Sequence, residues 1–484
     1  MKRFASALLI LAASIALIFT TPACSSKSTQ SSFVILSTND MHAQIEKFPS
    51  LISAINLCRD TAQVILVDAG DRWTGNAFVD MVDYYTPIYE LMNYAAYDVA
   101  IYGNHEFDKG QAYVAVANRQ AQWPIISANI ISDTTSFPQP LPYHIVEIDN
   151  KKIAFVSVVG NYDANGHPAG KDECYEGIRF IDPHTAAAQY GSLAEQCDML
   201  LLVSHSGLDR DIEFAESPLS QGYDQIISAH SHDEAIETIN GKLVSQTGSR
   251  LKNIGATTVT ISASGEVKLS HRNIPLSGYE PDAKAAEMVA GYHNNPMLNA
   301  PIGSAATPFN ESSLRNLFAE TIRNRTNSNI GLYHAGGVRI DTLKQGAVST
   351  ADILNAEPFG SLIATCMMTP SQIEELIIAK FNDTVNIGES HYVDITTTTP
   401  YTIVTDQSGD AVSVTFPTLD PKRTYKVAMG DYIFKTYRSL NYSEGEITDL
   451  LITESLEDVF KRSKEGVKPD NRELQNIVEQ QMAK

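Results

Sequence analysis

Histidines, aspartates and one asparagine stand in five short clusters within the first half of the chain. The side chains best suited to binding a metal ion are Asp40, His42, Asp71, Asn104, His205, His230 and His232. Imidazole nitrogens, carboxylates and one amide oxygen form a mixed set of ligands that contains no thiolate. Such a set suits divalent Zn, Mn or Fe better than Ca, which prefers oxygen ligands alone. Seven ligands are too many for one zinc ion but suit two ions that share a bridging carboxylate.

Two divalent ions in such a site favour phosphoryl chemistry. Ions about 3.5–4 Å apart clamp a phosphoryl group and turn a bound water into hydroxide near neutral pH. The single residues also have ordinary interpretations, because Asp and Asn after strands often form turns and an isolated histidine is often structural. Asp68 is left out of the predicted site, since capping of the turn at Gly70 explains it. The repetition of the pattern is what favours a metal centre.

Each cluster directly follows a short apolar run that must hold it in place. The runs cover residues 33–38, 64–67, 99–102, 199–203 and 226–227. Runs of this kind, bounded by Gly, Asp and Asn, indicate buried strands. An open α/β sheet gathers its binding groups at the carboxyl ends of such strands. We therefore expect the five clusters to meet at one site.

The size and charge of the chain limit what it can do. Its 484 residues are too many for one ordinary core and predict two or three domains. The net charge of −21 argues against a protein that binds a nucleic-acid polymer, which needs a concentrated basic face. The same charge is compatible with a small anionic substrate whose charge is met locally by metal ions.

The N-terminus has the layout of a secretory signal. A basic pair and an apolar stretch lead to Cys24, which a Ser-rich run follows. We expect residues 1–24 to be a signal peptide with a lipoprotein-type Cys24, and residues 25–32 to be a tether. The alternative is simple cleavage with Cys24 incidental. The predicted location is the periplasm or the cell surface, and the only predicted membrane contact is the lipid anchor.

The remaining cysteines do not indicate a thiolate metal site. None has CxxC spacing. Outside the cytoplasm Cys174 and Cys197 could form a disulfide, and the alternative is that the cysteines are small buried apolar residues.

Pattern changes along the chain predict its domains. Alternating strand and helix patterns over residues 33–274 indicate a layered α/β domain, with one helix expected at 185–197. A proline-marked stretch and an amphipathic helix at 283–292 predict a linker over residues 275–299. The second domain, residues 300–484, contains a helix that Thr369 caps in a capping box with Gln372. Residues 401–405 and 411–416 predict a hairpin.

The order of the clusters resembles a known family. The chain follows the pattern D-x-H, G-D, G-N-H-[ED], H and G-H-x-[HQ] of the calcineurin-like metallophosphoesterases. Residues 103–108, Gly-Asn-His-Glu-Phe-Asp, and the second domain make it similar to the bacterial periplasmic 5′-nucleotidase/UDP-sugar hydrolase family and its ecto-5′-nucleotidase relatives. The resemblance implies a four-layer metallophosphoesterase α/β sandwich followed by a smaller α/β substrate-binding domain.

The resemblance also implies a role for each residue of the predicted site. One ion would be held by Asp40, His42, Asp71 and His232. The other would be held by Asp71, Asn104, His205 and His230. His105 and Asp108 match the catalytic dyad of the family, in which the carboxylate orients a histidine that donates to the phosphoryl oxygens or the leaving group. Metal-bound hydroxide would attack phosphorus in line.

The second domain carries the residues that the resemblance assigns to the substrate. Residues 335–339, Ala-Gly-Gly-Val-Arg, match G-G-G-[IV]-R and imply that Arg339 binds phosphate; the alternative is an ordinary turn with a surface arginine. Phe359 matches an aromatic that stacks on the nucleobase, but Ser361 replaces the Asn of P-F-G-N. Tyr432 aligns with the second stacking aromatic, although a core tyrosine would fit equally well. The following Gly-Gly-Asp-Gly-Tyr is absent.

These observations predict an exported, metal-dependent phosphomonoester hydrolase that acts on nucleotides with two divalent ions, Zn, Mn or similar. The altered base pocket motivates an alternative, a two-metal phosphoesterase for cyclic nucleotides, nucleotide sugars or non-nucleotide phosphates. An alternative of another class is a surface binding protein on a retired enzyme scaffold. The complete ligand set argues against it.

Overall fold

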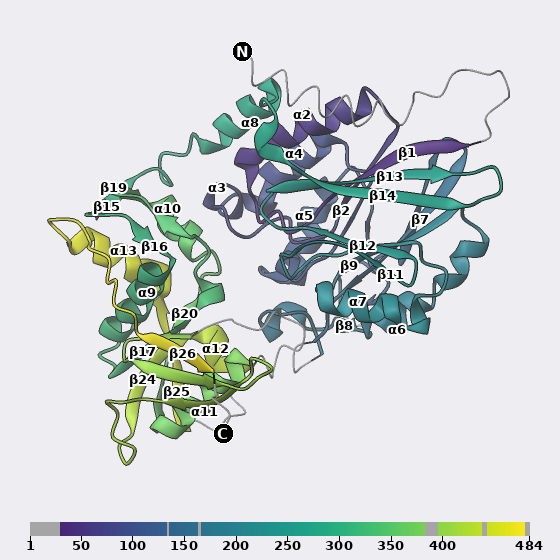
Figure 1. Ribbon diagram of the computed structural model, residues 1–484. Coiled ribbons are helices and arrows are strands. Elements are labelled where there is room, and N and C mark those ends of the chain that lie inside the picture. The colour runs from purple at the N-terminus through teal and green to yellow at the C-terminus, as the bar shows by residue number, and fades with distance from the viewer. Residues whose placement is uncertain (1–29, 133–134, 163–165, 383–394, 438–442, 480–484) are drawn as a thin grey trace.

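The computed structural model describes residues 30–132, 135–162, 166–382, 395–437 and 443–479. Figure 1 shows two lobes, the first mainly from the purple to teal part of the chain and the second from the green and yellow part. The predicted signal peptide, Cys24 and the first part of the tether lie outside the described residues, and the last two tether residues already belong to a strand. None of the described helices has the length and apolar composition needed to cross a bilayer.

The first lobe contains two six-stranded sheets. In the first sheet the order is β14 (Val267–Pro275), β13 (Asn253–Ile261), β1 (Ser31–Thr38), β2 (Val64–Asp68), β3 (Val99–Ile101) and β4 (Ile125–Ile126). Strands β1 to β4 run parallel, whereas β13 and β14 are antiparallel additions at one edge. Strands β2 and β3 are continuous apolar runs because parallel strands are buried on both faces.

The second sheet also has a parallel centre, but antiparallel strands lie at both of its edges. Its order is β11 (Glu234–Ile239), β12 (Lys242–Thr247), β10 (Gln225–Ile227), β9 (Met199–His205), β7 (Lys151–Val159) and β6 (Tyr143–Ile148). The four central strands are parallel, so the carboxyl ends of β9 and β10 lie at the same edge.

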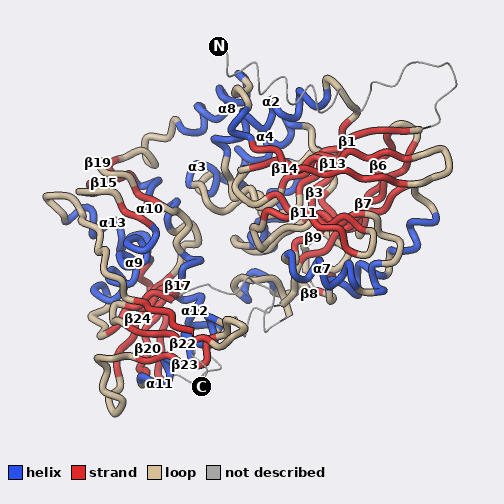
Figure 2. The backbone as a smooth tube through the Cα atoms, viewed as in Figure 1, coloured by secondary structure: helices blue, strands red, loops and turns tan. Residues whose placement is uncertain are grey.

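Helices cover the outer faces of the two sheets (Figure 2). The first sheet packs against α2 (Phe48–Arg59), α4 (Thr86–Ala95) and α8 (Ala283–His293). The second sheet packs against α6 (Pro183–Ala188) and α7 (Leu208–Glu216). A third apolar core, which includes Phe33 and Val67 of one sheet and Leu201 of the other, lies between the sheets. The order of layers is helix, sheet, sheet, helix, and the predicted four-layer sandwich is confirmed.

The second lobe is built on one five-stranded sheet. Its order is β21 (Ile395–Thr397), β17 (Ile330–His334), β24 (Tyr425–Gly430), β20 (Leu362–Met368) and β25 (Ser443–Leu451). Helices α9 (Glu311–Arg325) and α13 (Ile452–Arg462) pack on one face, and α11 (Pro370–Phe381) packs on the other. The smaller α/β domain predicted for the second half is confirmed.

Shorter elements complete the two lobes. Strands β22 (Tyr401–Thr405), β23 (Ala411–Thr415) and β26 (Gln475–Glu479) form a small sheet. The short helices are α3 (Ala77–Asp80), α5 (Gln111–Ala117), α10 (Thr350–Ala356) and α12 (Asp431–Thr436). The two-stranded pairs are β5 (Ile130–Ile131) with β8 (Arg179–Phe180), β15 (Pro301–Ala305) with β19 (Gly346–Ser349), and β16 (Phe309–Asn310) with β18 (Thr342–Leu343).

Local predictions have mixed outcomes. The capping box is confirmed, because the Thr369 side chain accepts from the Gln372 N–H and the Gln372 side chain accepts from Thr369. The hairpin of β22 and β23 is confirmed as well. The single helix at 185–197 is wrong: α6 ends at Ala188, and a 3₁₀ turn follows from Gly191. A Cβ at Gly191 would lie 2.5 Å from the Gln221 carbonyl oxygen, so close packing at this point accounts for the break. The helix of the predicted linker exists, but it packs into the core of the first lobe.

Candidate active site

The ends of five parallel strands carry all the predicted metal ligands. Asp40 and His42 follow β1, Asp71 follows β2, and Asn104 follows β3. From the second sheet, His205 is the last residue of β9, and His230 and His232 follow β10. The structure brings all seven side chains into one continuous group of contacts.

The backbone of these loops adopts an unusual conformation. Five of the predicted ligands have a positive φ, namely Asp40 (47°), His42 (45°), Asp71 (53°), His230 (81°) and His232 (62°). Non-glycine residues seldom adopt this left-handed conformation, because the Cβ crowds the backbone. Hydrogen bonds between loops hold it: the amide N of Asp40 lies 3.0 Å from the Gly70 carbonyl oxygen, and that of His42 lies 3.0 Å from the Asp71 oxygen.

Two glycines allow the loops after β2 and β3 to touch. A Cβ on Gly103 would lie 2.2 Å from Oδ1 of Asp71, and a Cβ on Gly70 would lie 2.6 Å from the amide N of Gly103. A side chain at either position would push these two ligand loops apart. The glycines therefore determine how closely Asp71 and Asn104 approach.

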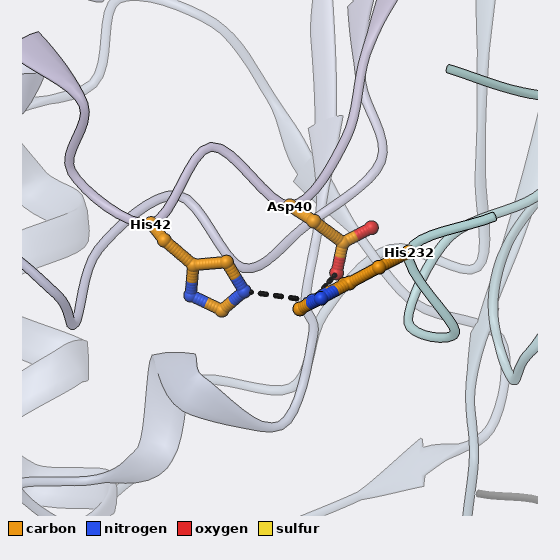
Figure 3. Close-up of side chains that lie close together, drawn as sticks. All are labelled: Asp40, His42 and His232. Carbon is orange, nitrogen blue, oxygen red and sulfur yellow. Dashed lines mark hydrogen bonds and ion pairs between the residues drawn. The ribbon is translucent and has the colours of Figure 1, made fainter. Parts of the chain in front are cut away.

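The first group of ligands is Asp40, His42 and His232 (Figure 3). The Nε2 atoms of His42 and His232 lie 3.0 Å apart, and Nε2 of His232 lies 3.4 Å from Oδ1 of Asp40. Nδ1 of His42 lies 3.1 Å from the Thr74 carbonyl oxygen and donates to it when it carries the proton. Nε2 then presents its lone pair to the group, as in metal-binding histidines.

The second group is Asp71, His205 and His230, and Asn104 lies beside it. Nε2 of His205 lies 3.1 Å from Oδ2 of Asp71. Nδ1 of His205 lies 2.8 Å from the Ala69 carbonyl oxygen, again the contact that turns Nε2 toward the group. Oδ1 of Asn104 lies 3.0 Å from Nδ1 of His230.

The buried carboxylates of the site favour a positive charge at its centre, and His205 must lose its proton before it can bind a metal ion. Burial lowers the pKa of His205, but the carboxylates of Asp71 and Asp40 outweigh it and raise that pKa to about 10. Burial and then the charge of Arg339 hold the pKa of His42 well below its usual range, so His42 is neutral, as a metal ligand must be. Facing imidazole nitrogens and adjacent buried carboxylates form a donor set that accommodates divalent metal ions.

His105 and Asp108 form the predicted dyad beside these groups. Nδ1 of His105 lies 2.8 Å from Oδ2 of Asp108, which also accepts from the Thr74 hydroxyl at 2.7 Å. Nε2 points the other way and lies 4.0 Å from Oδ2 of Asp71. Burial lowers the pKa of His105, but Asp108 and Asp71 together raise it above its usual value. His105 also forms a potential ligand group with His42 and Asp71, which the sequence did not predict.

A buried charged network supports the loop that carries Asp71. The Glu106 carboxylate accepts the amide N–H of Asp71 at 2.9 Å, of Arg72 at 2.9 Å and of Gly103 at 2.5 Å. Arg72 lies 3.7 Å from Glu106 and 3.1 Å from Asp68, and all three side chains are fully buried. Sequence reasoning missed this role of Glu106, and the G-N-H-E pattern that contains Glu106 was the only signal for it.

The second lobe contributes residues to the same site. The Arg339 guanidinium lies 3.2 Å from Nδ1 and 3.3 Å from Nε2 of His42, and 5.7 Å from the centre of the Phe359 ring. Phe359 in turn stacks near His105, with 5.8 Å between the ring centres. Arg339, Phe359 and Tyr432 all line one pocket that also includes Asp71 and His105. The substrate residues predicted from the second domain therefore face the predicted metal centre.

The same pocket has lining residues that the sequence did not single out. They include His334 at the end of β17, Lys380 in α11, and Lys171 and Tyr175 of a first-lobe segment, where Cys174 lines the pocket as well. Neither Cys174 nor Cys197 is in a disulfide, so their possible pairing is wrong. Cys174 is buried instead, as the alternative interpretation expected.

The sequence matches two families over separate segments. Residues 33–234 match the calcineurin-like phosphoesterases, and residues 289–440 match the 5′-nucleotidase C-terminal domain. The chain is similar to the trifunctional nucleotide phosphoesterase protein YfkN of Bacillus subtilis, with 24% identity over 73% of this chain. The chain spans only 28% of the length of YfkN.

Further similarities extend over most of the chain. Protein UshA of Yersinia enterocolitica is 24% identical over 75% of this chain and 76% of its own length. The crystal structure of a 5′-nucleotidase precursor from Thermus thermophilus has the same fold, with a TM-score of 0.79 and 19% identity over 93% of this chain and 99% of the other. The chain therefore combines a calcineurin-like phosphoesterase domain with a 5′-nucleotidase C-terminal domain that follows it.

Proposed function

We propose that this protein is a metal-dependent phosphomonoester hydrolase that acts on nucleotides. The observation that carries the proposal is the convergence of three overlapping ligand groups, linked by His42 and Asp71, on a pocket that Arg339 enters from the other lobe. The names of the relatives, a nucleotide phosphoesterase and a 5′-nucleotidase precursor, support a nucleotide substrate.

Two divalent ions, Zn, Mn or similar, would occupy the ligand groups. The first ion would be held by Asp40, His42, Asp71 and His232, and the second by Asp71, Asn104, His205 and His230. Bound there, the ions would supply Lewis-acid stabilisation of phosphoryl oxygens and acidify a water molecule. Asp71 would bridge the two ions, because its carboxylate has two oxygens and it groups with His42 of the first ion and with His205 and His230 of the second.

The protein's own side chains would hold and protonate the substrate. Arg339 would bind phosphate through bidentate contacts of its guanidinium group, and its distance of 3.2 Å from Nδ1 of His42 supports a contact beside the candidate ligands. His105 would donate a proton from Nε2 to the leaving oxygen, while Asp108 fixes the ring through Nδ1. Phe359 and Tyr432, on the walls of the same pocket, would contact the nucleoside.

We also propose that the protein acts outside the cytoplasm. A signal peptide over residues 1–24 would deliver it to the periplasm or the cell surface, and lipidation of Cys24 would anchor it to a membrane. The working part would comprise residues 33–274 and 300–484, with residues 275–299 between them. Mass spectrometry of the protein purified from its own membranes would detect a diacylglycerol adduct on Cys24, and an unmodified mature N-terminus would contradict anchoring.

The hydrolase proposal is tested with the protein from residue 25 onward. The assay measures phosphate release from nucleoside monophosphates, 2′,3′-cyclic nucleotides, UDP-glucose and an aryl phosphate, each with Mn, Zn or Co and after treatment with a chelator. We expect turnover of nucleoside monophosphates that chelation abolishes and added metal restores. Turnover of the aryl phosphate alone would refute the nucleotide assignment. No turnover with any metal would favour a binding protein.

A further inference from the structure

The wall of the pocket that comes from the second lobe is cationic. Arg339 and Lys380 line it together with the neutral side chains of His334, Ser361 and Tyr432, and no carboxylate of the described second-lobe residues lines it. The chain as a whole has 57 acidic and 36 basic residues, so this wall is basic in a protein that is acidic overall. Arg339 is already assigned to the phosphate. The second cation requires another explanation.

Lys380 lines the pocket although its side chain is almost fully shielded from bulk solvent. It lies in the last turn of α11, and its side chain is 1% exposed. A charge in such surroundings interacts strongly with its neighbours, because little water screens it. The neighbouring His334 shows the effect, since burial and then the charges of Lys380 and Arg339 lower its pKa to about 3. His334 is therefore neutral and adds no charge of its own.

The first lobe contributes a further ammonium group to the lining of the pocket. Lys171, in the first-lobe segment, lines the pocket, and its Nζ lies 3.4 Å from Oδ2 of Asp431. Asp431 is not among the lining residues, so the pocket wall includes the lysine and not its carboxylate partner. Two lysines therefore line the pocket that Arg339 and Phe359 also line.

Hydrogen-bond donors on a wall select for acceptors on the ligand. An ammonium group has three N–H donors and no acceptor. A carbonyl or anionic oxygen can accept from it, whereas an amino group at the same place presents a donor to a donor and leaves both unpaired. Ser361 replaces the amide oxygen of the family pattern with the oxygen of a hydroxyl group, and that hydroxyl interacts with the Glu357 carboxylate.

We propose that the pocket selects phosphate esters whose leaving group presents oxygen acceptors to Lys380 and Lys171. Among nucleotides, these are the esters with an oxo group on the base, 6-oxopurine or 4-oxopyrimidine, in preference to their amino counterparts. This inference rests on the proposed hydrolase function and specifies its substrate class. It makes Lys380 a specificity-determining residue that contacts the leaving group and takes no part in the chemical step.

Matched substrates test the inference with a change of one functional group. IMP and AMP differ at C6 of the purine and in the proton on the adjacent N1, and UMP and CMP differ at C4 of the pyrimidine and in the proton on the adjacent N3. With the metal-loaded protein we expect kcat/KM to be at least about tenfold higher for IMP than for AMP, and for UMP than for CMP. In the Lys380→Met variant both ratios should fall toward one. The Lys422→Met variant changes an exposed lysine outside the pocket and should keep the ratios of the wild type.

The outcomes separate this inference from the function on which it rests. Equal kcat/KM within both wild-type pairs, with nucleotides turned over, would overturn the inference and leave the hydrolase intact. A preference for adenosine 3′,5′-bisphosphate over AMP without discrimination between IMP and AMP would overturn the assignment to oxo bases. Turnover of the aryl phosphate alone would overturn the nucleotide function and the inference with it. If Lys380→Met fails to fold, the wild-type ratios and the Lys171→Met variant decide.

Discussion

Replacement of Glu106 by Gln should weaken metal binding although Glu106 is not a predicted ligand. The carboxylate accepts three amide N–H groups, two of them on one oxygen and one on the other. A Gln amide has one oxygen, so its NH₂ group must face the N–H of Arg72 or those of Asp71 and Gly103. The better choice keeps the two bonds that join the ligand loops and loses the bond and the ion pair to Arg72.

The expected magnitudes follow from these contacts. A buried N–H left without a partner costs about 1–3 kcal/mol, and a lost charge-assisted bond has a similar effect, so we expect Glu106→Gln to lower the unfolding free energy by about 3–5 kcal/mol. Because the loop that positions Asp71 loses its anchor, metal affinity should fall by about 10–100-fold, as for other residues that orient ligands.

The assay compares Glu106→Gln with Asp68→Asn. Asp68 accepts from the Nε–H of the same Arg72 guanidinium, but among the described contacts it accepts no backbone N–H from the Asp71 loop. Urea denaturation of the chelator-treated proteins measures stability, and calorimetric titration with Zn or Mn measures affinity. Both variants should be destabilised, and only Glu106→Gln should bind metal more weakly. Equal metal affinity in the two variants at equal stability would refute the reasoning, since Glu106 would then serve the fold alone.

Three further predictions concern the site and its surroundings. Asp71→Asn should lower the occupancy of both metal positions, measured by elemental analysis, and loss of only one metal would contradict a bridging role. His105→Ala should keep the metal content and reduce kcat by about 10²–10⁴-fold, whereas an empty site would make His105 a ligand. Burial raises the pKa of Asp211 to about 7 from the unfolded value of 3.8, although interactions with the Ser204 and Ser228 hydroxyls lower it. The folded state therefore binds this proton more tightly than the unfolded chain does. The free energy of unfolding that the proton contributes is complete below pH 4 and is lost as the pH rises through 7. The change amounts to about 4 kcal/mol. Asp211→Asn should remove this loss, as measured by urea denaturation of chelator-treated protein from pH 4 to 8, and an unchanged pH profile would contradict it.

The sequence was sufficient to predict that the candidate metal ligands converge, because its signals are local. Each ligand stands within a few residues of the end of an apolar run, and parallel strands necessarily bring their carboxyl ends together. Asp40, Asp71 and His205 could therefore be placed without knowledge of the sheet order. Arg339 lies 297 positions from His42, and only the resemblance to a known family connected it with the site.

The residues that the sequence could not identify depend on packing between distant segments. Lys380 resembles any lysine at the end of a helix until α11 is docked against the pocket. The roles of Arg72 and Glu106 depend on two loops that two glycines allow to touch. The helix predicted at 185–197 ends early because the contact between Gly191 and Gln221 is tertiary, and periodicity does not detect such contacts.

The left-handed backbone of the ligand loops has a consequence for heat inactivation. Each non-glycine residue in this conformation is about 1–2 kcal/mol less favourable than in an ordinary one, and five of the predicted ligands adopt it. The surrounding fold must impose this shape, so the loops are the part of the first lobe with most to gain from local relaxation. On slow warming we expect activity and bound metal to be lost before the sheets unfold. Excess metal should stabilise the loops, so the temperature at which activity is lost should approach the temperature at which the sheets unfold.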